Sequence, residues 1–145
     1  MRLLGLDLGS RTIGIALSDS AESMALMKET FRFAQDDYDA ALDRVEEYVQ
    51  EYGIKEVVLG FPKHMNGDIG EKAQLSIDFK DAMEKYLGVK VYLQDERLTT
   101  ASSLKTISLE LGGKSKMRKS LVDQMSAANI LQDFLDRRKK EHVGE

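Results

Sequence analysis

Three carboxylates lie at positions from which they could act together on a phosphodiester bond. Asp7 lies between two leucines in the first apolar run of the chain, Glu96 follows the apolar segment 89–93, and Asp123 lies near the start of the last predicted helix. An isolated carboxylate in an apolar setting is costly unless it is paired or bound to a metal. Converging carboxylates repel one another, and divalent cations relieve that repulsion and can activate water for phosphoryl displacement.

Each of these carboxylates also has a purely structural interpretation, which the sequence leaves open. Asp7 could accept backbone hydrogen bonds in the turn at Gly9, and Glu96 could be a solvated residue in a local ion pair. Ser120 and Asp123 have the spacing of a capping box, in which the acid satisfies the helix start and its dipole. Spacing alone therefore does not show that the three acids converge.

Composition limits the kind of metal site that this chain could form. The chain has 145 residues, no cysteine and two histidines, His64 and His142. Disulfides and thiolate zinc sites are excluded, so carboxylates would have to supply most ligands, and oxygen ligands favour Mg²⁺ or Mn²⁺. The length suits one compact domain. No apolar run approaches the roughly 20 residues that cross a bilayer, and the first run does not fit a signal peptide.

Charge is unevenly distributed along the chain. The formal net charge is −4, whereas nucleic-acid-binding proteins are usually basic. Four cations fall within residues 114–119 and four more at 137–140, while acids crowd residues 36–56. The first basic run is predicted as a loop just before Asp123, where it could contact phosphates or could be solvated. The second run fits a structural role, because cations near a helix C-terminus are stabilising.

Hydrophobic periodicity and turn residues predict an α/β fold. Five strands are predicted, within 3–10 and at 13–18, 28–33, 56–61 and 89–93. Helices are predicted from a cap at Asp36 or Asp37 to Gly53, at 71–87, over a segment that carries Leu104, Ile107 and Leu111 after a cap at Thr99 or Thr100, and at 120–139. Three hairpin-linked strands followed by strand–helix crossovers indicate a mixed sheet with helices packed on it.

Acidic residues mark the ends of two predicted strands. Asp7 lies two residues before the turn that ends the first strand, and Asp95 and Glu96 follow the strand at 89–93. In sheets built from parallel crossovers, ligand sites lie beyond the carboxyl ends of the strands. Asp7 and Glu96 would therefore share a crevice if their strands were parallel neighbours.

The segment after the first strand permits a phosphate-binding interpretation. Gly9 and Gly14 flank Arg11 and Thr12, and glycines let a backbone approach a ligand closely and expose its amide donors. The alternative is a hairpin that needs a positive φ at Gly9. The pattern GxxxxGK[ST] is absent, which excludes a Walker-type nucleotide site.

Four segments together resemble one protein family. They are DLGSRTIGIALSD at 7–19, GFPKHMNG at 60–67, DERLTT at 95–100 and VDQMSAANIL at 122–131. In this order they are similar to the YqgF family, also called RuvX, which comprises Holliday-junction-resolvase-like proteins assigned to maturation of pre-16S ribosomal RNA. The similarity covers essentially the whole chain, and the last three segments make it specific.

The resemblance implies a single ribonuclease H-like domain over residues 1–145, with a five-stranded mixed sheet flanked by helices. It implies a hydrolase that cuts phosphodiester bonds in structured nucleic acid, with Asp7, Glu96 and Asp123 as catalytic acids and as ligands of Mg²⁺ or Mn²⁺. It also implies a cytoplasmic protein, monomeric or homodimeric, with precursor rRNA or four-way DNA as substrate and ribosomal particles as partners. The cations expected to contact nucleic acid are Arg11, Lys63, Arg97, Lys114, Lys116, Arg118 and Lys119.

Two other functions are compatible with the sequence. In the first, the acids are structural and the protein is a non-catalytic RNA-binding or ribosome-binding factor. In the second, DLGSRTIGIAL is a phosphate loop like that of actin-like ATPases and sugar kinases. Those proteins clamp nucleotide between two such domains, whereas this chain has the length of one, so the second function ranks below a nuclease.

Overall fold

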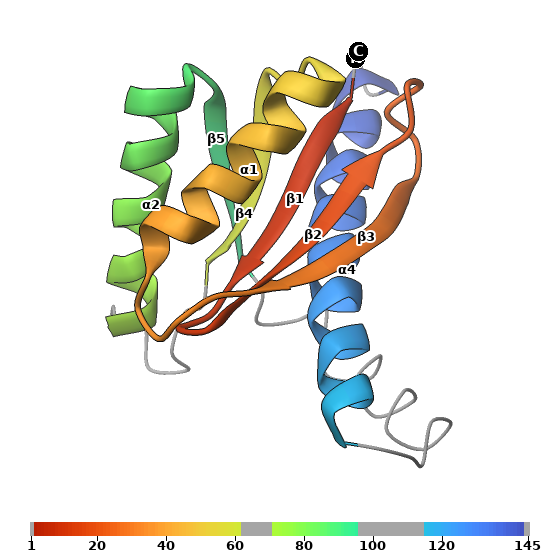
Figure 1. The fold of residues 1–145 in the computed structure, drawn as a ribbon. Helices are drawn as coiled ribbons and strands as arrows, with labels where there is room; N and C mark the ends of the chain where they lie inside the picture. Colours follow the sequence, from red (N-terminus) through yellow and green to blue (C-terminus); the bar gives the residue numbers. More distant parts are fainter. Residues whose placement is uncertain (1, 62–70, 96–114, 144–145) are drawn as a thin grey trace.

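A five-stranded mixed sheet organises the protein, as predicted (Figure 1). The computed structural model describes residues 2–61, 71–95 and 115–143. The strands are β1 (Leu3–Leu8), β2 (Thr12–Ser18), β3 (Ala25–Arg32), β4 (Glu56–Phe61) and β5 (Lys90–Asp95), and the helices are α1 (Tyr38–Tyr52), α2 (Glu71–Leu87) and α4 (Ser115–Val143). Among these residues, no helix is both long and apolar enough to cross a membrane.

The strands lie in the order β3-β2-β1-β4-β5. The hairpin-linked strands β1, β2 and β3 pair antiparallel, while β4 pairs parallel with both β1 and β5. The carboxyl ends of β1, β4 and β5 therefore meet at one side of the sheet, which we call the carboxyl edge. This is the edge at which sheets with parallel crossovers place their ligand sites.

Helices cover both faces of the sheet (Figure 1). Leu4 and Leu6 of β1 belong to a core shared with α1 and α2, whereas Leu3 belongs to a second core with Ile130 and Leu131 of α4. This division follows from the alternation of side chains along a strand. Consecutive residues of β1 consequently face different helices.

Helix α4 lies very close to β1, and Gly5 makes this possible. A Cβ atom added at Gly5 would lie 2.6 Å from Cβ of Leu131 and 2.9 Å from the carbonyl oxygen of Ala127. Real Cβ atoms are essentially never found that close to a neighbour. Glycine at this position therefore fixes the distance between the central strand and the helix.

The ends of α1 agree with the sequence prediction. The Asp37 side chain accepts a hydrogen bond from the backbone N–H of Ala40, so Asp37 is the N-cap. Gly53 ends the helix with a φ of 63°, a left-handed conformation that favours glycine. Gly88, with a φ of 67°, closes α2 in the same way.

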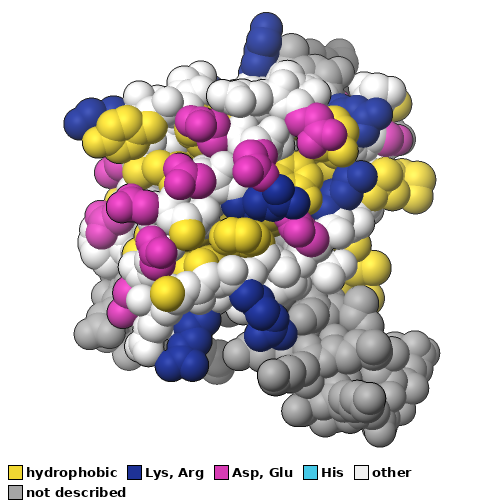
Figure 2. All heavy atoms as spheres, in the orientation of Figure 1, with side chains coloured by type: hydrophobic (Ala, Val, Ile, Leu, Met, Phe, Trp, Pro, Cys, Tyr) yellow, Lys and Arg dark blue, Asp and Glu magenta, His cyan; other side chains and the backbone are white. Residues whose placement is uncertain are grey.

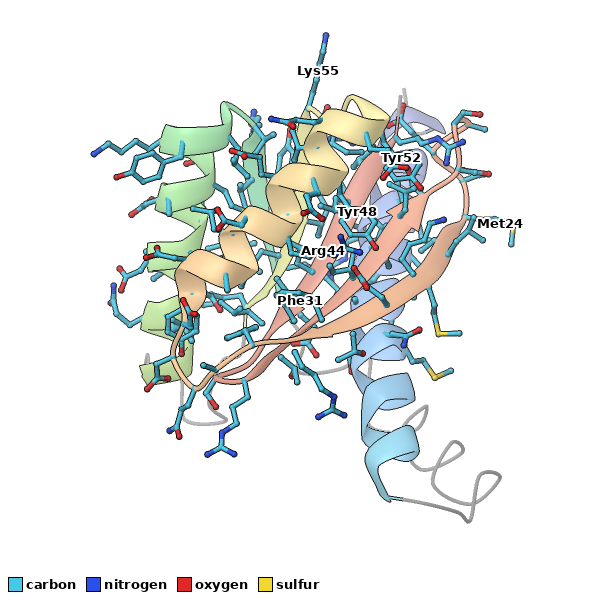
Figure 3. The ribbon with its side chains drawn as sticks, viewed as in Figure 1. Met24, Phe31, Arg44, Tyr48, Tyr52 and Lys55 are labelled. Carbon is cyan, nitrogen blue, oxygen red and sulfur yellow. The ribbon has the colours of Figure 1, made fainter. Side chains whose placement is uncertain are left out.

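A polar cluster holds α1 against β3 (Figure 3). Arg44 Nε lies 2.5 Å from Glu29 Oε1, which also accepts a hydrogen bond of 2.9 Å from the Tyr48 hydroxyl. Burial, together with this bond to Glu29, raises the pKa of Tyr48 well above its ordinary value, so the hydroxyl remains a donor at physiological pH. Arg44 also stacks over the ring of Tyr48, 5.2 Å from its centroid.

The predicted boundaries that are wrong by three residues or more lie at the start of β3 and at both ends of α4, which ends at Val143 rather than at residue 139. Strand β3 begins at Ala25 rather than at residue 28, because β2 pairs with β3 on both sides of an irregularity between Ile15 and Ala16. Helix α4 begins at Ser115 rather than at residue 120, so residues 115–119 of the basic run are helical. Lysine, arginine and methionine are good helix formers, and their propensity outweighs the weak repulsion between cations and the helix dipole.

Candidate active site at the carboxyl edge

Asp7 lies at the carboxyl edge, in the central strand. It is paired with Gly14 of β2 and follows directly after Leu6, the last residue of β1 in register with β4. It is half-buried. Because Leu6 faces α1 and α2, and Gly5 meets α4, the alternation of β1 puts Asp7 on the α4 face. The strand thus directs this carboxylate toward the helix that carries Asp123.

Helix α4 runs antiparallel to β1. Arg138 near its end donates to Glu56 at 2.6 Å, and Glu56 is the first residue of β4, in register with Leu3. Earlier in α4, Ala127 lies close to Gly5 of β1. The start of α4 therefore lies at the carboxyl edge and extends past it (Figure 1).

Asp123 lies on α4 one turn before Ala127, the residue that approaches Gly5. Asp7 lies two residues after Gly5, in the same direction along the molecule. The backbone thus brings the positions of Asp7 and Asp123 to the same side of the sheet, although the side chain of Asp123 lies outside the described part. The predicted capping box is wrong, since α4 begins at Ser115 and its first turn holds no acid.

Glu96 lies outside the described residues, directly after β5, whose last residue Asp95 pairs with Phe61. Strands β1 and β5 are parallel to each other, as expected for a shared crevice, but they are not neighbours because β4 lies between them. Within the described ranges, no group of three acids or histidines is close enough to hold a metal ion.

The predicted nucleic-acid contacts are divided among three regions. Arg11 is exposed in the β1–β2 turn and donates to Gln35 Oε1 at 2.9 Å. The backbones of Lys116, Arg118 and Lys119 form the first turns of α4, while their side chains lie outside the described part. Lys63, Arg97 and Lys114 lie outside the described residues altogether.

The turn at Gly9 does not need glycine for the reason that the sequence suggested. Gly9 has no positive φ, whereas Gly53 and Gly88 do. Its backbone N–H donates to the carbonyl of Thr12 at 2.8 Å and closes the turn. A Cβ atom at Gly9 would lie 3.4 Å from the same oxygen, which is an ordinary contact.

A cleft that the sequence analysis missed opens at the same edge, on the α1 and α2 face. Its volume is about 480 Å³. It is lined by residues 8–10 at the end of β1, by Asp36 and Tyr38 before and at the start of α1, and by Gln74, Leu75 and Asp78 of α2. Tyr38 and Leu75 fit the apolar periodicity of their helices, which is the pattern of core residues. The sequence alone does not distinguish an apolar residue that lines a cleft from one that is packed in the core.

Arg138, in the second basic run, has a structural role, which it fulfils through side-chain contacts rather than through the helix dipole that the sequence suggested. It donates to Glu56 and, at 3.3 Å, to Glu22. Its guanidinium lies 4.9 Å from the centroid of the Phe134 ring and 5.5 Å from that of Tyr92. These contacts fasten the end of α4 to the sheet.

Curated relatives resemble this chain over nearly their whole length. A protein of Bacillus subtilis is 42% identical over 136 residues, which is 94% of this chain and 98% of the relative. A protein of Acetivibrio thermocellus is 40% identical over 141 residues, or 97% of this chain and 99% of the relative. Both bear the name "Putative pre-16S rRNA nuclease".

Solved structures of resolvases share the fold. RuvC of Thermus thermophilus, in complex with a Holliday junction substrate, matches with a TM-score of 0.61 at 15% identity over 96% of each chain. The fowlpox virus resolvase with Holliday junction DNA matches with a TM-score of 0.57 at 14% identity, over 94% of this chain and 98% of that one. The ribonuclease H-like fold predicted from the sequence is confirmed.

The family model described as "RuvX: Holliday junction resolvase" matches residues 1–137, and this chain belongs to that family.

Proposed function

We propose that this protein is a divalent-metal-dependent nuclease that hydrolyses phosphodiester bonds at the carboxyl edge, with Asp7, Glu96 and Asp123 as its catalytic acids. The observation that carries the proposal is the close contact of Gly5 with Ala127. Because of it, Asp7 on β1 and the position of Asp123 on α4 lie on the same side of the sheet. Membership of the family supports this function over a nucleotide-binding module or a non-catalytic RNA-binding factor.

The residues present fit a hard divalent cation. Asp7 offers carboxylate oxygens from a half-buried position, and oxygen ligands are those that Mg²⁺ and Mn²⁺ prefer. Glu96 and Asp123 would complete an all-carboxylate set. The bound cation would activate the attacking water and offset the negative charge that develops on the leaving oxygen.

The chain's own residues would bind and orient the substrate. Asp7 pairs with Gly14 of β2, and Leu6 directly before it pairs with Leu59 of β4, so the backbone at Asp7 is fixed before substrate arrives. Arg11 is exposed on the turn that follows and has guanidinium donors beyond the one given to Gln35, so it can bind a phosphate. The cations at the start of α4 would bind a more distant phosphate of the same strand.

The preferred substrate is precursor 16S rRNA, because relatives with about 40% identity over nearly the whole chain are named for it. The proposed cleavage position is its 5′ end. This substrate would place the protein in the cytoplasm with ribosomal particles as partners. A four-way DNA junction is the second candidate, supported by the description of the family and by resolvase structures bound to such DNA.

The test compares Asp7→Asn with Asp43→Asn, which makes the same change at an exposed position of α1. Each protein is incubated with precursor rRNA or four-way DNA, with Mn²⁺ or with EDTA. We expect cleavage by the wild type and Asp43→Asn in Mn²⁺ only, and a loss of at least about 10³-fold in Asp7→Asn, because a neutral amide is a poor substitute for a central metal ligand. Mn²⁺ should also raise the melting temperature of the wild type more than that of Asp7→Asn. Cleavage retained by Asp7→Asn, or by the wild type in EDTA, would contradict the proposal.

A further inference from the structure

The cleft on the α1 and α2 face lies one residue away from the proposed active site. Leu8 lines the cleft, whereas Asp7, the preceding residue of β1, faces α4. Consecutive residues of a strand project to opposite faces, so a nucleic acid strand that crosses the carboxyl edge at Asp7 passes the mouth of the cleft. Arg11, a phosphate-binding candidate, follows directly after Ser10 of the cleft wall.

Two walls of the cleft, the β1–β2 turn and the segment before α1, are fixed to each other by a backbone hydrogen bond. The N–H of Asp36 donates to the carbonyl of Ser10 at 2.8 Å, which joins the β1–β2 turn to the segment before α1. Asp36 adopts a φ of 63°, a left-handed conformation that aspartate tolerates better than most residues. These two walls are therefore in place before any ligand arrives, and the cleft volume of about 480 Å³ lies within the roughly 300–1,000 Å³ of small-molecule sites.

The polar groups of the cleft select against a phosphate and in favour of a ligand with hydrogen-bond donors. Asp36 and Asp78 are carboxylates, which repel anions and accept hydrogen bonds only. The Tyr38 hydroxyl donates its hydrogen to Asp36 at 3.0 Å, and burial followed by this bond raises the pKa of Tyr38, so it stays protonated. The ring of Tyr38 and the side chains of Leu8 and Leu75 supply apolar surface. Because the ligand of the proposed function is a nucleic acid, the part of it that fits these groups is a flat base that carries hydrogen-bond donors.

Gln74 and Asp78 lie side by side on α2 and present a specific hydrogen-bonding pattern. Gln74 Nε2 donates one hydrogen to Asp78 Oδ1 at 3.1 Å and retains a second hydrogen. Next to this donor, the Asp78 carboxylate can accept further hydrogen bonds. Guanine is the one common base whose Watson–Crick edge has the complementary order, with the acceptor O6 beside the donors N1–H and N2–H.

We propose that this cleft binds one unpaired guanine of the nucleic-acid substrate, with Asp78 accepting from N1–H and N2–H, Gln74 donating to O6 and Tyr38 contacting the base. The proposal rests on the proposed function, since it assumes a nucleic-acid ligand. It assigns a specificity-determining role to residues that lie on the sheet face opposite the catalytic acids. Bases of single strands are commonly recognised through their Watson–Crick edges and aromatic contacts in this way.

The test measures binding without cleavage, in EDTA, with fluorescein-labelled RNA pentamers UUGUU, UUAUU, UUCUU and UUUUU. We expect UUGUU to bind about tenfold or more tightly than UUUUU, which is the discrimination given by a good bidentate contact. Asp78→Asn should reduce this preference to about twofold or less, because the amide replaces one acceptor with a donor. Asp81→Asn, on the same helix but outside the cleft, should retain it.

NMR spectra of the wild-type protein locate the bound base independently of any variant. The side-chain amide resonances of Gln74 should shift on addition of UUGUU and much less on addition of UUUUU. Equal affinities for the four pentamers, a guanine preference that persists in Asp78→Asn, or no shift at Gln74 would overturn the proposal. A protein that prefers guanine but cuts no substrate would instead contradict the nuclease function alone, and cleavage that is indifferent to guanine would contradict the cleft proposal alone.

Discussion

Asp19 shows how one half-buried residue organises the turn between β2 and β3 through its carboxylate. It accepts hydrogen bonds from the N–H and the hydroxyl of Ser23, both at 2.8 Å, and from the N–H of Met24 at 3.2 Å. These bonds, led by the one from the Ser23 backbone, lower the pKa of Asp19 below its ordinary value of 3.8. The charged form is therefore favoured in the folded protein.

This lowered pKa predicts a pH-dependent contribution to stability. The contribution of Asp19 is fully present above the pKa of the unfolded chain and is lost as the pH falls through the lower pKa of the folded state. Asp19→Ala should therefore be less stable than the wild type at pH 7, and the difference should shrink as the pH falls below about 4. Urea unfolding of both proteins at several pH values checks this, and a difference that does not change with pH would contradict it.

At the residue level, the sequence indicated candidates but not their surroundings. Two signals pointed to Asp7: its setting between leucines, which is unusual for a charge, and its place in a family motif. In the structure Asp7 lies at the carboxyl edge. The cleft residues Gln74 and Asp78 carry no such signal. A glutamine and an aspartate four residues apart on a helix are common, and they form one side of a cleft only because the β1–β2 turn packs beside α2.

At the scale of elements, Gly5 fixes the distance between β1 and α4, and this predicts the effect of a single methyl group. In Gly5→Ala, the new Cβ would meet the Ala127 carbonyl, a backbone atom that cannot rotate away. The helix must shift, at a cost of roughly 1–3 kcal/mol in the free energy of unfolding. Cleavage should fall by more than the unfolded fraction explains, because Asp7 and Asp123 would move apart.

Gly9→Ala is the matched control for this variant, since its Cβ would make only ordinary contacts with Thr12. Its free energy of unfolding should change by about 0.5 kcal/mol or less. Denaturant unfolding of both variants compares their stabilities, and cleavage is measured for Gly5→Ala where it is fully folded, because Gly9 itself lines the cleft. Equal stability losses in Gly5→Ala and Gly9→Ala would mean that the close approach of α4 does not constrain the fold.

The elements themselves were largely predictable, while their arrangement was not. Apolar runs and turn residues found all five strands, and helical periodicity with glycine caps found α1 and α2 with ends close to those observed. Strand order depends on contacts between distant segments, so the sequence did not reveal that β4 separates β1 from β5. The start of α4 was misplaced because a run of cations is a weak guide to a helix boundary when its residues are themselves good helix formers.

At the scale of the whole molecule, charge separates two surfaces of a protein whose net charge is −4. Acidic side chains gather over the outer surface of α1, as Figure 2 shows. The exposed acids of that helix are Asp39, Asp43, Glu46, Glu47 and Glu51. This surface repels a phosphate backbone, so nucleic acid should approach from the carboxyl edge, where the start of α4 carries its cations.

Helical spacing aligns these cations with the proposed site. Lys116, Lys119, Asp123 and Ala127 are separated by three, four and four residues, which places them on one face of α4. Ala127 is the residue of this series that approaches Gly5. A strand bound along this face would therefore lead from the basic turns to the proposed catalytic acids.

The last prediction follows from this alignment. Each phosphate contact that is lost should lower the slope of log affinity against log salt concentration by roughly one unit. Reversing two cations in Lys116→Glu/Lys119→Glu should therefore reduce the slope by about two units and weaken binding similarly for all sequences. The matched control is Lys55→Glu/Lys85→Glu, which changes the net charge equally at the other end of the molecule, where Lys55 projects away from the start of α4 (Figure 3). Binding of a structured RNA in Ca²⁺ at several salt concentrations measures both slopes. If both double variants lose the same slope, net charge alone governs binding, whereas an intact slope in Lys116→Glu/Lys119→Glu would mean that the basic turns of α4 do not contact phosphate.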